Sequence, residues 1–467
     1  MRMMRVLLIA YDNGSYIHTF PQGLAYITAA LMKEGHWVEI YSQDIFHHDE
    51  SHLRKHLDEN HYDVVGVGVI GGYYQYRKLL KISKAINTSR QRPRHYILGS
   101  FGPSPDPEYF LNKTGADFVV IGEGEITVVD LLRTIEEGSR EFRAVDGIAF
   151  HEDGKFVKTA ERGLIQDVDS IDWPAYEKFD VDHYKLIRFP HAKNDEFVMP
   201  ILSARGCTFK CNFCYRMDKG YRARSASGIV DEIRHLQDRY GVSYVEFNDE
   251  LLMSSSGRIA DICDAFLTSG LRFKWFCSGR LNYASTKNLE LMKRAGCVFI
   301  NYGIESLDDT VLKNMNKALN SKQIIRGIEN TLKVGISPGF NIIFGNIGDD
   351  RETLQKSVDF LIRYDDGAQL RTIRPVTPYP GCPLYYHAIK EGLLEGTEEF
   401  YEKKHVNSDL LAVNFTGLSD DEFHDALMAA NTALLRNYYD RRRDDAIEMT
   451  RRLYQDRDVS FRGYRQT

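Results

Sequence analysis

The sequence predicts an α/β protein with three parts: an N-terminal doubly wound, Rossmann-like domain, a partial (β/α)6 barrel of the TIM type, and a small helical C-terminal region. Short apolar segments alternate with amphipathic segments over residues 5–137 and again over 198–381, with a less regular stretch between them. Such alternation is typical of parallel sheets covered by helices. We expect these parts at residues 1–140 (Rossmann-like), 141–195 (linker), 196–390 (barrel) and 391–467 (helical).

The N-terminal series begins with the apolar run RVLLIA at 5–10. We expect strands at 5–10, 37–42, 62–72, 95–105 and 116–125, and helices at 23–35, 51–60, 76–88 and 126–137. Ligands of such sheets bind at the carboxyl ends of the strands. Glycines at 71–72, 99–102 and 122–124 fall at those ends, which makes these turns candidate binding loops.

The expected linker contains a hairpin-like piece at 147–161 and a polar, aromatic part around Trp173 and Pro174. After it we expect strands at 200–204, 242–250, 274–280, 297–306, 337–345 and 370–381, with helices at 226–240, 256–269, 286–295, 321–334 and 351–364. Functional residues of such a barrel lie at the carboxyl ends of its strands. From its position alone, we expect the helical C-terminal region to cover the barrel mouth.

Bulk composition excludes several classes of protein. The formal net charge is -6, so no nucleic-acid partner is expected, and the arginine-rich but mixed-charge segment 440–465 favours a solvated helix. The apolar run near the N-terminus is too short for a signal sequence, and no stretch of about 18 apolar residues occurs. We therefore expect a cytoplasmic protein without a membrane partner.

Three cysteines in one loop carry the strongest chemical signal. ARGCTFKCNFCYR at 204–216 places Cys207, Cys211 and Cys214 in C-x3-C-x2-C spacing directly after a strand. Iron–sulfur clusters prefer four thiolates, so three leave one iron open to chelate the amino and carboxylate groups of S-adenosylmethionine (SAM). A zinc knuckle would need a fourth Cys or His nearby, and the next cysteine is Cys263. The spacing predicts a [4Fe–4S] cluster with an open iron.

Four further cysteines are scattered along the chain. We expect them to be core residues, with an auxiliary cluster as the alternative; they are Cys263, Cys277, Cys297 and Cys382.

With these motifs placed, the chain resembles the cobalamin-binding radical SAM enzymes, which include the anaerobic magnesium-protoporphyrin ester cyclase and several C-methyltransferases. The resemblance spans roughly residues 5–390. Its N-terminal part rests on PQGLAYITAALMKEGH (21–36), YDVVGVGV (62–69), LGSFGPSP (98–105) and DFVVIGEGEITVVDLL (117–132). Its barrel part rests on the cysteine motif with Phe213, EFNDELL (246–252), SGRLN (278–282), AGCVFINYGIES (295–306) and PYPGCPLY (378–385).

The resemblance implies that the N-terminal domain holds cobalamin between its strand ends and the barrel. The residues carried over are Gly71, Gly72, Tyr73, Gly99, Ser100, Phe101, Gly102, Glu123 and Gly124. Ordinary tight βα turns are the alternative for each. The D-x-H-x-x-G string of B12-dependent mutases does not occur, so any cobalamin is expected to lack a protein histidine below cobalt, or the domain is vestigial.

The resemblance also implies a set of SAM contacts at the barrel strand ends. Asp249 and Glu250 would pair with the SAM ammonium, and Arg280 beside Ser278 would bind its carboxylate. Glu305 would accept hydrogen bonds from the ribose hydroxyls, with Asn341 and Phe213 nearby. The alternative for each is a barrel-top salt bridge or a helix cap. GNIGDD at 345–350 departs from the family's G-L-P-G-E-T-like loop, and Cys382 stands where P-G-T is common, an unusual thiol near the barrel top.

The function implied is reductive cleavage of SAM to a 5′-deoxyadenosyl radical, which abstracts hydrogen from an unactivated carbon. The commonest outcome in the family is C-methylation of a small molecule. The alternatives are rearrangement, cyclisation or epimerisation, with cobalamin in a non-methylating role or absent, and a non-catalytic iron–sulfur or zinc module. Expected partners are a small-molecule substrate and an electron donor such as flavodoxin or ferredoxin.

Overall fold

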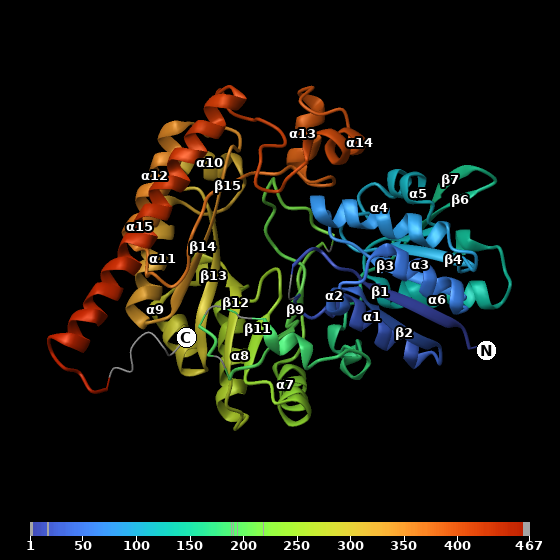
Figure 1. Ribbon diagram of the computed structural model, residues 1–467, viewed down its shortest axis with the longest axis horizontal. Coiled ribbons are helices and arrows are strands. Elements are labelled where there is room, and N and C mark those ends of the chain that lie inside the picture. Colours follow the sequence, from blue (N-terminus) through green and yellow to red (C-terminus); the bar gives the residue numbers. More distant parts are fainter. Residues whose placement is uncertain are drawn as a thin grey trace.

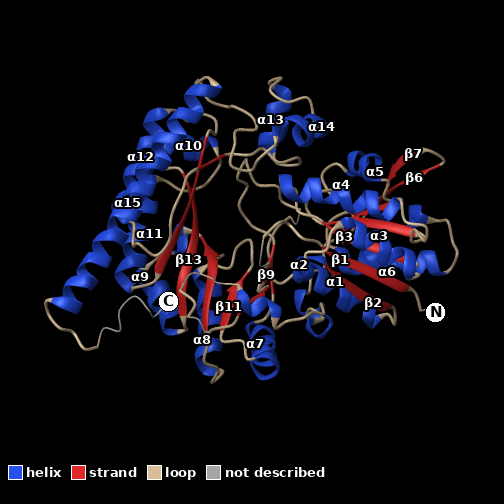
Figure 2. Ribbon diagram, viewed as in Figure 1, coloured by secondary structure: helices blue, strands red, loops and turns tan. Residues whose placement is uncertain are grey.

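The computed structural model describes residues 3–15, 18–187, 189, 191–193, 195–217 and 219–460 of the chain. Two α/β bodies stand side by side, and C-terminal helices lie above and along them (Figure 1). Each body is built on its own sheet, one of seven strands and one of six (Figure 2). The predicted fold class is confirmed. Within the described residues, no helix has the length and apolarity needed to span a membrane.

The N-terminal sheet has the strand order β2-β1-β3-β4-β5-β6-β7, and the first five strands are parallel. Its parallel strands are β1 (Arg5–Ala10), β2 (Trp37–Ser42), β3 (Val64–Gly68), β4 (His95–Gly99) and β5 (Phe118–Val120). Strands covered on both faces read as nearly continuous apolar runs, and β1 is buried along almost its whole length. The chain reverses its winding between β1 and β3, the place where ligands of such sheets bind.

Helices cover both faces of this sheet, as a doubly wound fold requires. The helices are α1 (Gln22–Lys33), α2 (Gln43–Phe46), α3 (Glu50–Glu59), α4 (Tyr73–Asn87), α5 (Pro107–Thr114) and α6 (Gly124–Glu136). One apolar core joins Leu31 of α1 to Leu131 of α6, and a separate core joins Leu53 of α3, Leu79 of α4 and Phe110 of α5. Helix α5 was not expected; Asp106 caps its N-terminus and Pro107 begins it.

The hairpin of the expected linker belongs to the N-terminal sheet. Strand β6 (Ile148–Glu152) pairs antiparallel with β5, and β7 (Lys155–Lys158) pairs antiparallel with β6. A division at residue 140 therefore separates these two strands from their own sheet. Because a hairpin is a local pattern, the sequence indicates its existence but not the strand edge on which it adds.

The second sheet is parallel throughout, in the order β15-β14-β13-β12-β11-β8, which is the predicted half-barrel. Its strands are β8 (Val198–Ile201), β11 (Tyr244–Phe247), β12 (Lys274–Gly279), β13 (Cys297–Glu305), β14 (Ser337–Phe344) and β15 (Arg374–Pro375). The intervening helices are α7 (Ala226–Tyr240), α8 (Ser256–Thr268), α9 (Thr286–Arg294), α10 (Asp309–Asn314), α11 (Ser321–Val334) and α12 (Arg351–Tyr364).

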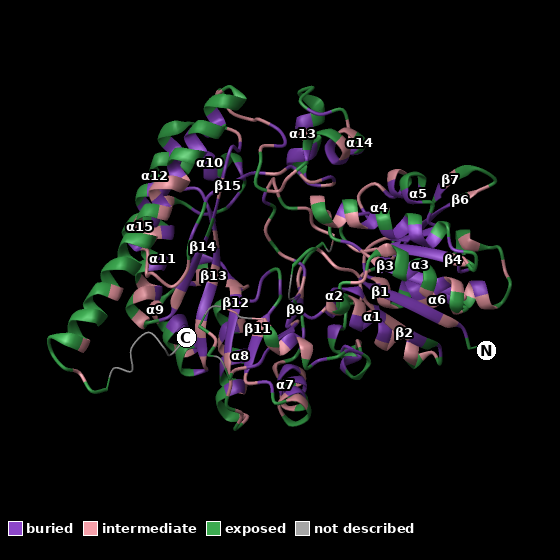
Figure 3. Cartoon of the chain, viewed as in Figure 1, coloured by how far each residue is buried: buried purple, intermediate pink, exposed green. Residues whose placement is uncertain are grey.

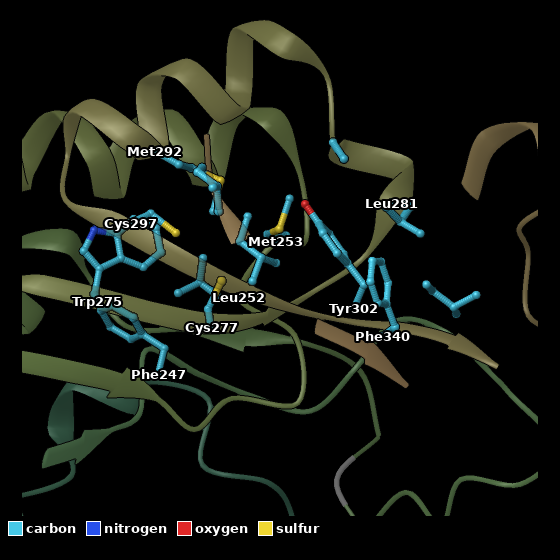
Figure 4. Close-up of a cluster of buried hydrophobic side chains, with 14 of the residues drawn as sticks. Phe247, Leu252, Met253, Trp275, Cys277, Leu281, Met292, Cys297, Tyr302 and Phe340 are labelled. Atoms are coloured by element: carbon cyan, nitrogen blue, oxygen red, sulfur yellow. The ribbon is translucent and has the colours of Figure 1, made fainter. Parts of the chain in front are cut away.

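Side chains alternate between the two faces of this sheet. The outward face carries Trp275, Cys277 and Tyr302, which pack with Met292 and Phe340 in the core under the helices (Figure 4). This burial raises the pKa of the Cys277 thiol, as it does for Cys297. These two cysteines are core residues, as expected.

The C-terminal region divides between the two bodies. Helix α13 (Pro383–Lys390), α14 (Thr397–Glu399) and the turn Phe400–Lys404 pack on the N-terminal domain, where Tyr401 stacks on Tyr76 with ring centroids 4.6 Å apart. Helix α15 (Asp420–Tyr454) instead packs along α12, with Phe423 stacked on Phe344.

The expectation that this region as a whole covers the barrel mouth is therefore wrong for α15, which runs along the outside of the barrel (Figure 1). The far part of α15 is largely exposed, as expected of a solvated mixed-charge helix (Figure 3).

Candidate functional site

The three cysteines lie on one loop that rises from the first barrel strand. The loop follows β8 and is closed at its base by β9 (Ala204–Arg205) and β10 (Arg222–Ala223), which pair antiparallel. Cys211 is buried, Cys207 half-buried and Cys214 exposed. The Cys211 and Cys214 thiols are within hydrogen-bonding reach of each other. The base therefore fixes where the loop starts and ends, and the thiols gather at the top of the barrel.

Two cations stand beside the buried thiol. A hydrogen bond from Cys214 and the charges of Lys317 and Arg280 lower the pKa of Cys211 to about 6. That same hydrogen bond raises the pKa of Cys214, and burial raises the pKa of Cys207. Thiolates are the metal-ligating form, so cationic surroundings favour ligation by this loop.

Arg280, at the end of β12, is the centre of the contacts under the loop. Its guanidinium lies 3.5 Å from the ring centroid of Phe209 and donates to the backbone oxygen of Lys317. Nη1 is 3.9 Å from Cys211 Sγ, and Nε donates to Asn282 Oδ1 at 3.3 Å. These contacts give Arg280 the geometry of a positioning residue for the cysteine loop; its contact with a SAM carboxylate stays a prediction.

Glu305, at the end of β13, is paired with a lysine that sequence reasoning missed. Lys317 Nζ lies 2.9 Å from Glu305 Oε1, and both residues are buried. Lys317 also lies 5.7 Å from the ring centroid of Phe213, the residue before the third cysteine. Glu305 has a φ of 69°, a left-handed backbone that is uncommon outside glycine. That strain, visible only in the structure, marks the turn as a candidate functional position.

Asp249 holds the start of the cysteine loop in place. Its Oδ1 accepts hydrogen bonds from the backbone N–H groups of Ser203 at 2.6 Å and Ala204 at 3.1 Å, and its Oδ2 accepts from the Ser203 hydroxyl. Burial raises the pKa of Asp249 to about 6. Both oxygens are thus used to fasten the end of β8 to the end of β11. Its neighbour Glu250 is exposed and close enough to raise the pKa of Cys207.

The inward face of the half-barrel changes from aromatic to polar along the strands. Tyr244, Phe276 and Phe299 form a small buried cluster on its lower part. Above it, Ser278 pairs laterally with Asn301 in the β12–β13 register, and Asn341 pairs with Gly303 in the β13–β14 register. Ser278 is half-buried and Asn341 exposed, so the two expected residues share one open, polar face.

Glu246, which sequence reasoning passed over, lies on this inward face beside the aromatic cluster. It pairs laterally with Phe276 in the β11–β12 register, and its charge is one of those that raise the pKa of Tyr244. Burial alone raises the pKa of Glu246 to about 7. Its signal in the sequence is a carboxylate at an inward position of an otherwise apolar strand.

The loop after β4 meets the cysteine loop. Phe101 packs edge-on against Tyr215, the residue after the third cysteine, with centroids 6.2 Å apart, and Ser104 Oγ lies 3.9 Å from Met217 Sδ. Ser100 has a φ of 79° at the end of β4. The carboxyl edge of the N-terminal sheet is thus placed against the cysteines.

Two of the predicted glycines make this edge compact. A Cβ on Gly71 would lie 2.8 Å from the Tyr401 hydroxyl, and one on Gly102 would lie 3.0 Å from the Val69 carbonyl oxygen. Gly102 N also donates to that oxygen at 2.9 Å. These glycines therefore allow the loops after β3 and β4 to pack on each other.

The remaining members of the predicted cobalamin set lie at the same edge of the sheet. Gly72 caps α4, Tyr73 begins it and is half-buried, and Gly99 ends β4. Gly124 begins α6, where a Cβ would lie 2.7 Å from Ile27 Cδ1.

Glu123 binds the two domains together. Its carboxylate accepts from Arg205 Nη1 at 2.8 Å, from Arg222 Nη1 at 2.9 Å and from the Ile165 backbone N–H at 2.7 Å. Arg205 also pairs with Glu125 at 2.5 Å. Glu123 thus connects the β5–α6 turn to both strands at the base of the cysteine loop, an ionic network that we call the base clamp.

Two family descriptions match the chain: the B12 binding domain over residues 15–132 and the radical SAM superfamily over residues 201–361. An uncharacterized methyltransferase of Pyrococcus horikoshii is 30% identical over 84% of this chain and 85% of its own length. The chain belongs to the cobalamin-binding radical SAM enzymes.

A cytidylyl-2-hydroxyethylphosphonate methyltransferase of Streptomyces wedmorensis is 25% identical over 90% of this chain and 88% of its own length. The radical SAM methyltransferase TsrM of Kitasatospora setae, solved with cobalamin and a [4Fe–4S] cluster, shares the fold, with a TM-score of 0.72 and 18% identity over 93% of this chain and 89% of TsrM.

Membership makes this chain an enzyme that uses a [4Fe–4S] cluster, SAM and cobalamin, and the site fits these groups. Three thiols on one loop beside Arg280 and Lys317 suit an anionic thiolate cluster with one open iron. The polar inward face next to that loop suits a nucleoside, and the compact glycine loops at the sheet edge suit a large ring system.

Cys382, the unusual thiol expected near the barrel top, is a core residue like the other scattered cysteines. It is fully buried at the N-cap of α13, and burial raises its pKa to about 11. Cys263 is likewise buried, in the core between α8 and the barrel sheet. Both behave as core residues.

Proposed function

We propose that this enzyme methylates an unactivated carbon of a small molecule. The observation that carries the proposal is the contact between Phe101 and Tyr215, which sets the carboxyl edge of the N-terminal sheet against the loop of three cysteines. A reaction that uses both cofactors on one substrate carbon needs their binding surfaces to be adjacent. The methyltransferase names of the relatives support the same reading.

The bound cofactors supply the radical that removes hydrogen from carbon and the methyl group that replaces it. The chain's own residues hold these groups in position and shield them from water. Cys207, Cys211 and Cys214 hold the cluster, while Arg280 and the Asp249 contacts keep their loop in one place. Ser278, Glu305 and Asn341 offer hydrogen bonds to SAM from the ends of successive strands.

The substrate occupies the inward face of the half-barrel in this proposal. The aromatic floor of Tyr244, Phe276 and Phe299 excludes water, and Glu246 beside it is a half-buried carboxyl. A carboxyl shielded from water is stabilised by a hydrogen-bond donor or a cation as its partner. We therefore expect a substrate that carries an amino group, an amide or a hydroxyl at the end that reaches Glu246. Reduction of the cluster would come from a flavodoxin or ferredoxin, and the cytoplasmic location stays a prediction.

Anaerobic reconstitution tests the proposal. The protein is loaded with iron, sulfide and hydroxocobalamin, reduced, and mixed with SAM and with the small-molecule fraction of a cell extract as the source of substrate. 5′-Deoxyadenosine and S-adenosylhomocysteine are measured by liquid chromatography with mass spectrometry. Replacing Cys207, Cys211 and Cys214 with Ala should abolish 5′-deoxyadenosine. The matched control is Cys277→Ala, a buried cysteine outside the loop, which should keep it.

Both nucleosides in similar amounts support methyl transfer, because one SAM gives the radical and a second restores the methyl group. 5′-Deoxyadenosine alone supports a rearrangement, cyclisation or epimerisation. A protein that retains no corrin after gel filtration supports a SAM enzyme without cobalamin. Undiminished 5′-deoxyadenosine from the triple variant would overturn the proposal.

A further inference from the structure

A cluster of two histidines and an aspartate lies at the β1–β2 side of the N-terminal sheet, on residues outside the cysteine loop. Asp12 follows β1, His18 lies further along the same loop, and His47 ends α2. One ligand atom from each side chain lies within 4.8 Å of the other two. The loops assigned above to cobalamin follow β3, β4 and β5, so the cluster shares no residue with them, although β1 pairs with β3 in the sheet.

The carboxylate of Asp12 bridges the two imidazoles. His18 Nε2 lies 3.2 Å from Asp12 Oδ1, and His47 Nδ1 lies 3.0 Å from Asp12 Oδ2. Four ligands around a tetrahedral zinc ion, each about 2.0 Å from the metal, stand about 3.3 Å from one another. The two histidine–aspartate spacings are therefore close to what one shared ion requires, and the spacing between the histidine nitrogens is at most 4.8 Å.

The burial of His18 points to a ligand. His18 is 6% exposed, and its buried Nε2 atom faces Asp12 Oδ1 at 3.2 Å without the alignment of a hydrogen bond. Buried polar nitrogens are normally hydrogen-bonded, so this contact leaves Nε2 poorly satisfied. A metal ion between Nε2 and the Asp12 carboxylate would satisfy it.

The backbone around the cluster holds the ligands in place. Gly14 N–H donates to Asp12 Oδ1 at 2.7 Å, and the Asp12 N–H donates to Gln43 Oε1 at 3.4 Å, which ties the loop to the start of α2. His47 has a φ of 50°, a left-handed conformation that turns the chain at the end of α2. The charge of His18 also acts on Asp44, whose Oδ2 accepts from the Tyr184 hydroxyl at 2.7 Å.

We propose that Asp12, His18 and His47 form a zinc site that fastens the β1–α1 loop to the end of α2. Two imidazoles and a carboxylate are a ligand set that zinc accepts, with a fourth position left for water. The site is independent of the proposed methyl transfer, because it shares no residue with the cysteine loop or the barrel face. A negative 5′-deoxyadenosine assay would leave it untouched.

The test measures zinc on the full-length protein whose cysteine loop already carries its iron–sulfur cluster, so the three thiolates cannot take zinc. Isothermal titration with Zn²⁺ gives the affinity, and mass spectrometry of the metals gives the ratio of zinc to protein. Titration with Co²⁺ adds a spectrum, since nitrogen and oxygen ligands give weak visible bands without the strong thiolate charge-transfer band.

We expect one zinc per chain, and affinity at least about tenfold weaker in His18→Ala, His47→Ala and Asp12→Asn. Binding should weaken as the pH falls, since imidazole must be neutral to bind metal. The matched control is His61→Ala, because His61 lies near a single carboxylate, 3.9 Å from Asp63, and is 67% exposed. This variant should bind zinc as the unaltered protein does.

Circular dichroism checks that each variant is folded. If His18→Ala does not fold, zinc binding by His47→Ala tests the proposal instead. The His47 side chain is 35% exposed, so its replacement removes a ligand without opening the core. The proposal would be overturned if the unaltered protein bound less than a tenth of an equivalent of zinc. It would also be overturned if His47→Ala and Asp12→Asn bound zinc as tightly as His61→Ala does.

Discussion

Removal of one charge from the base clamp should loosen the joint between the two domains. Glu123→Gln removes the ion pair between Glu123 and Arg222, whose side chains are 5% and 8% exposed in the unaltered protein. Taking one partner from a buried ion pair costs about 3–5 kcal/mol. Arg205 keeps Glu125 at 2.5 Å, so we expect the lower end, about 3 kcal/mol. For domains of this size, 1 kcal/mol corresponds to about 2–4 °C in melting temperature, which gives a fall of about 6–12 °C.

Scanning calorimetry of the full-length protein at pH 7.5 measures this fall. The matched control is Glu161→Gln, because Glu161 pairs with Lys219 of the same loop at 3.7 Å while both side chains are about three-quarters exposed. An exposed pair contributes little, so the control should melt within about 1 °C of the unaltered protein. Equal melting temperatures for the two variants would refute the clamp.

The pH dependence of Glu123→Gln provides a second check. Arginine neighbours and the Ile165 N–H hold the pKa of Glu123 below its ordinary value of 4.5 against the effect of burial. A carboxyl with a lowered folded-state pKa stabilises the fold above its unfolded pKa, and that contribution disappears as the pH falls through the folded value. The difference between Glu123→Gln and the unaltered protein should therefore be full above pH 4.5 and shrink below it.

Three further predictions test the site. Burial raises the pKa of the Glu246 carboxyl to about 7, and only its ionised form is disfavoured in the folded protein. Glu246→Gln should therefore raise the free energy of unfolding at pH 8 by up to about 3 kcal/mol, with a higher melting temperature, and leave both unchanged at pH 4; a loss of stability at pH 8 would contradict this. Lys317→Met should have a lower melting temperature than the double variant Lys317→Met with Glu305→Gln, because a buried carboxylate without its cation destabilises the fold more than a neutral pair does. The opposite order of melting temperatures in calorimetry would refute this prediction. Gly102→Ala should lower stability by about 1–3 kcal/mol, because its Cβ meets a backbone oxygen at 3.0 Å, whereas Gly23→Ala, with nothing within 4 Å, should be neutral or stabilising.

Much of the fold follows from local patterns. The six barrel strands appear in the structure close to where their apolar runs stand in the sequence, because burial on one or both faces of a sheet imposes that composition. Helix α5 was passed over, since Asp106–Pro107 reads equally well as a loop. The β6–β7 hairpin was recognised, but its place on the edge of the first sheet was not.

The candidate site was predictable in part, for a similar reason. The cysteine loop was identified because its three cysteines lie within a few residues of one another. Glu246 was missed because one carboxylate in an apolar strand has no meaning until its face is known. Lys317 was missed because its role depends on Glu305, on a different turn of the chain.

The sequence by itself determined the two α/β bodies, the cluster loop and the family of the enzyme, because periodicity and short motifs are properties of neighbouring residues. Only the tertiary structure decided which partner each charged side chain takes. Glu123, expected near cobalamin, pairs with Arg205, which is 82 residues away, and Asp249 turns to Ser203, 46 residues away. Such pairings depend on strand register and domain docking. The three-ligand cluster of Asp12, His18 and His47 likewise exists only once β1 and α2 lie side by side.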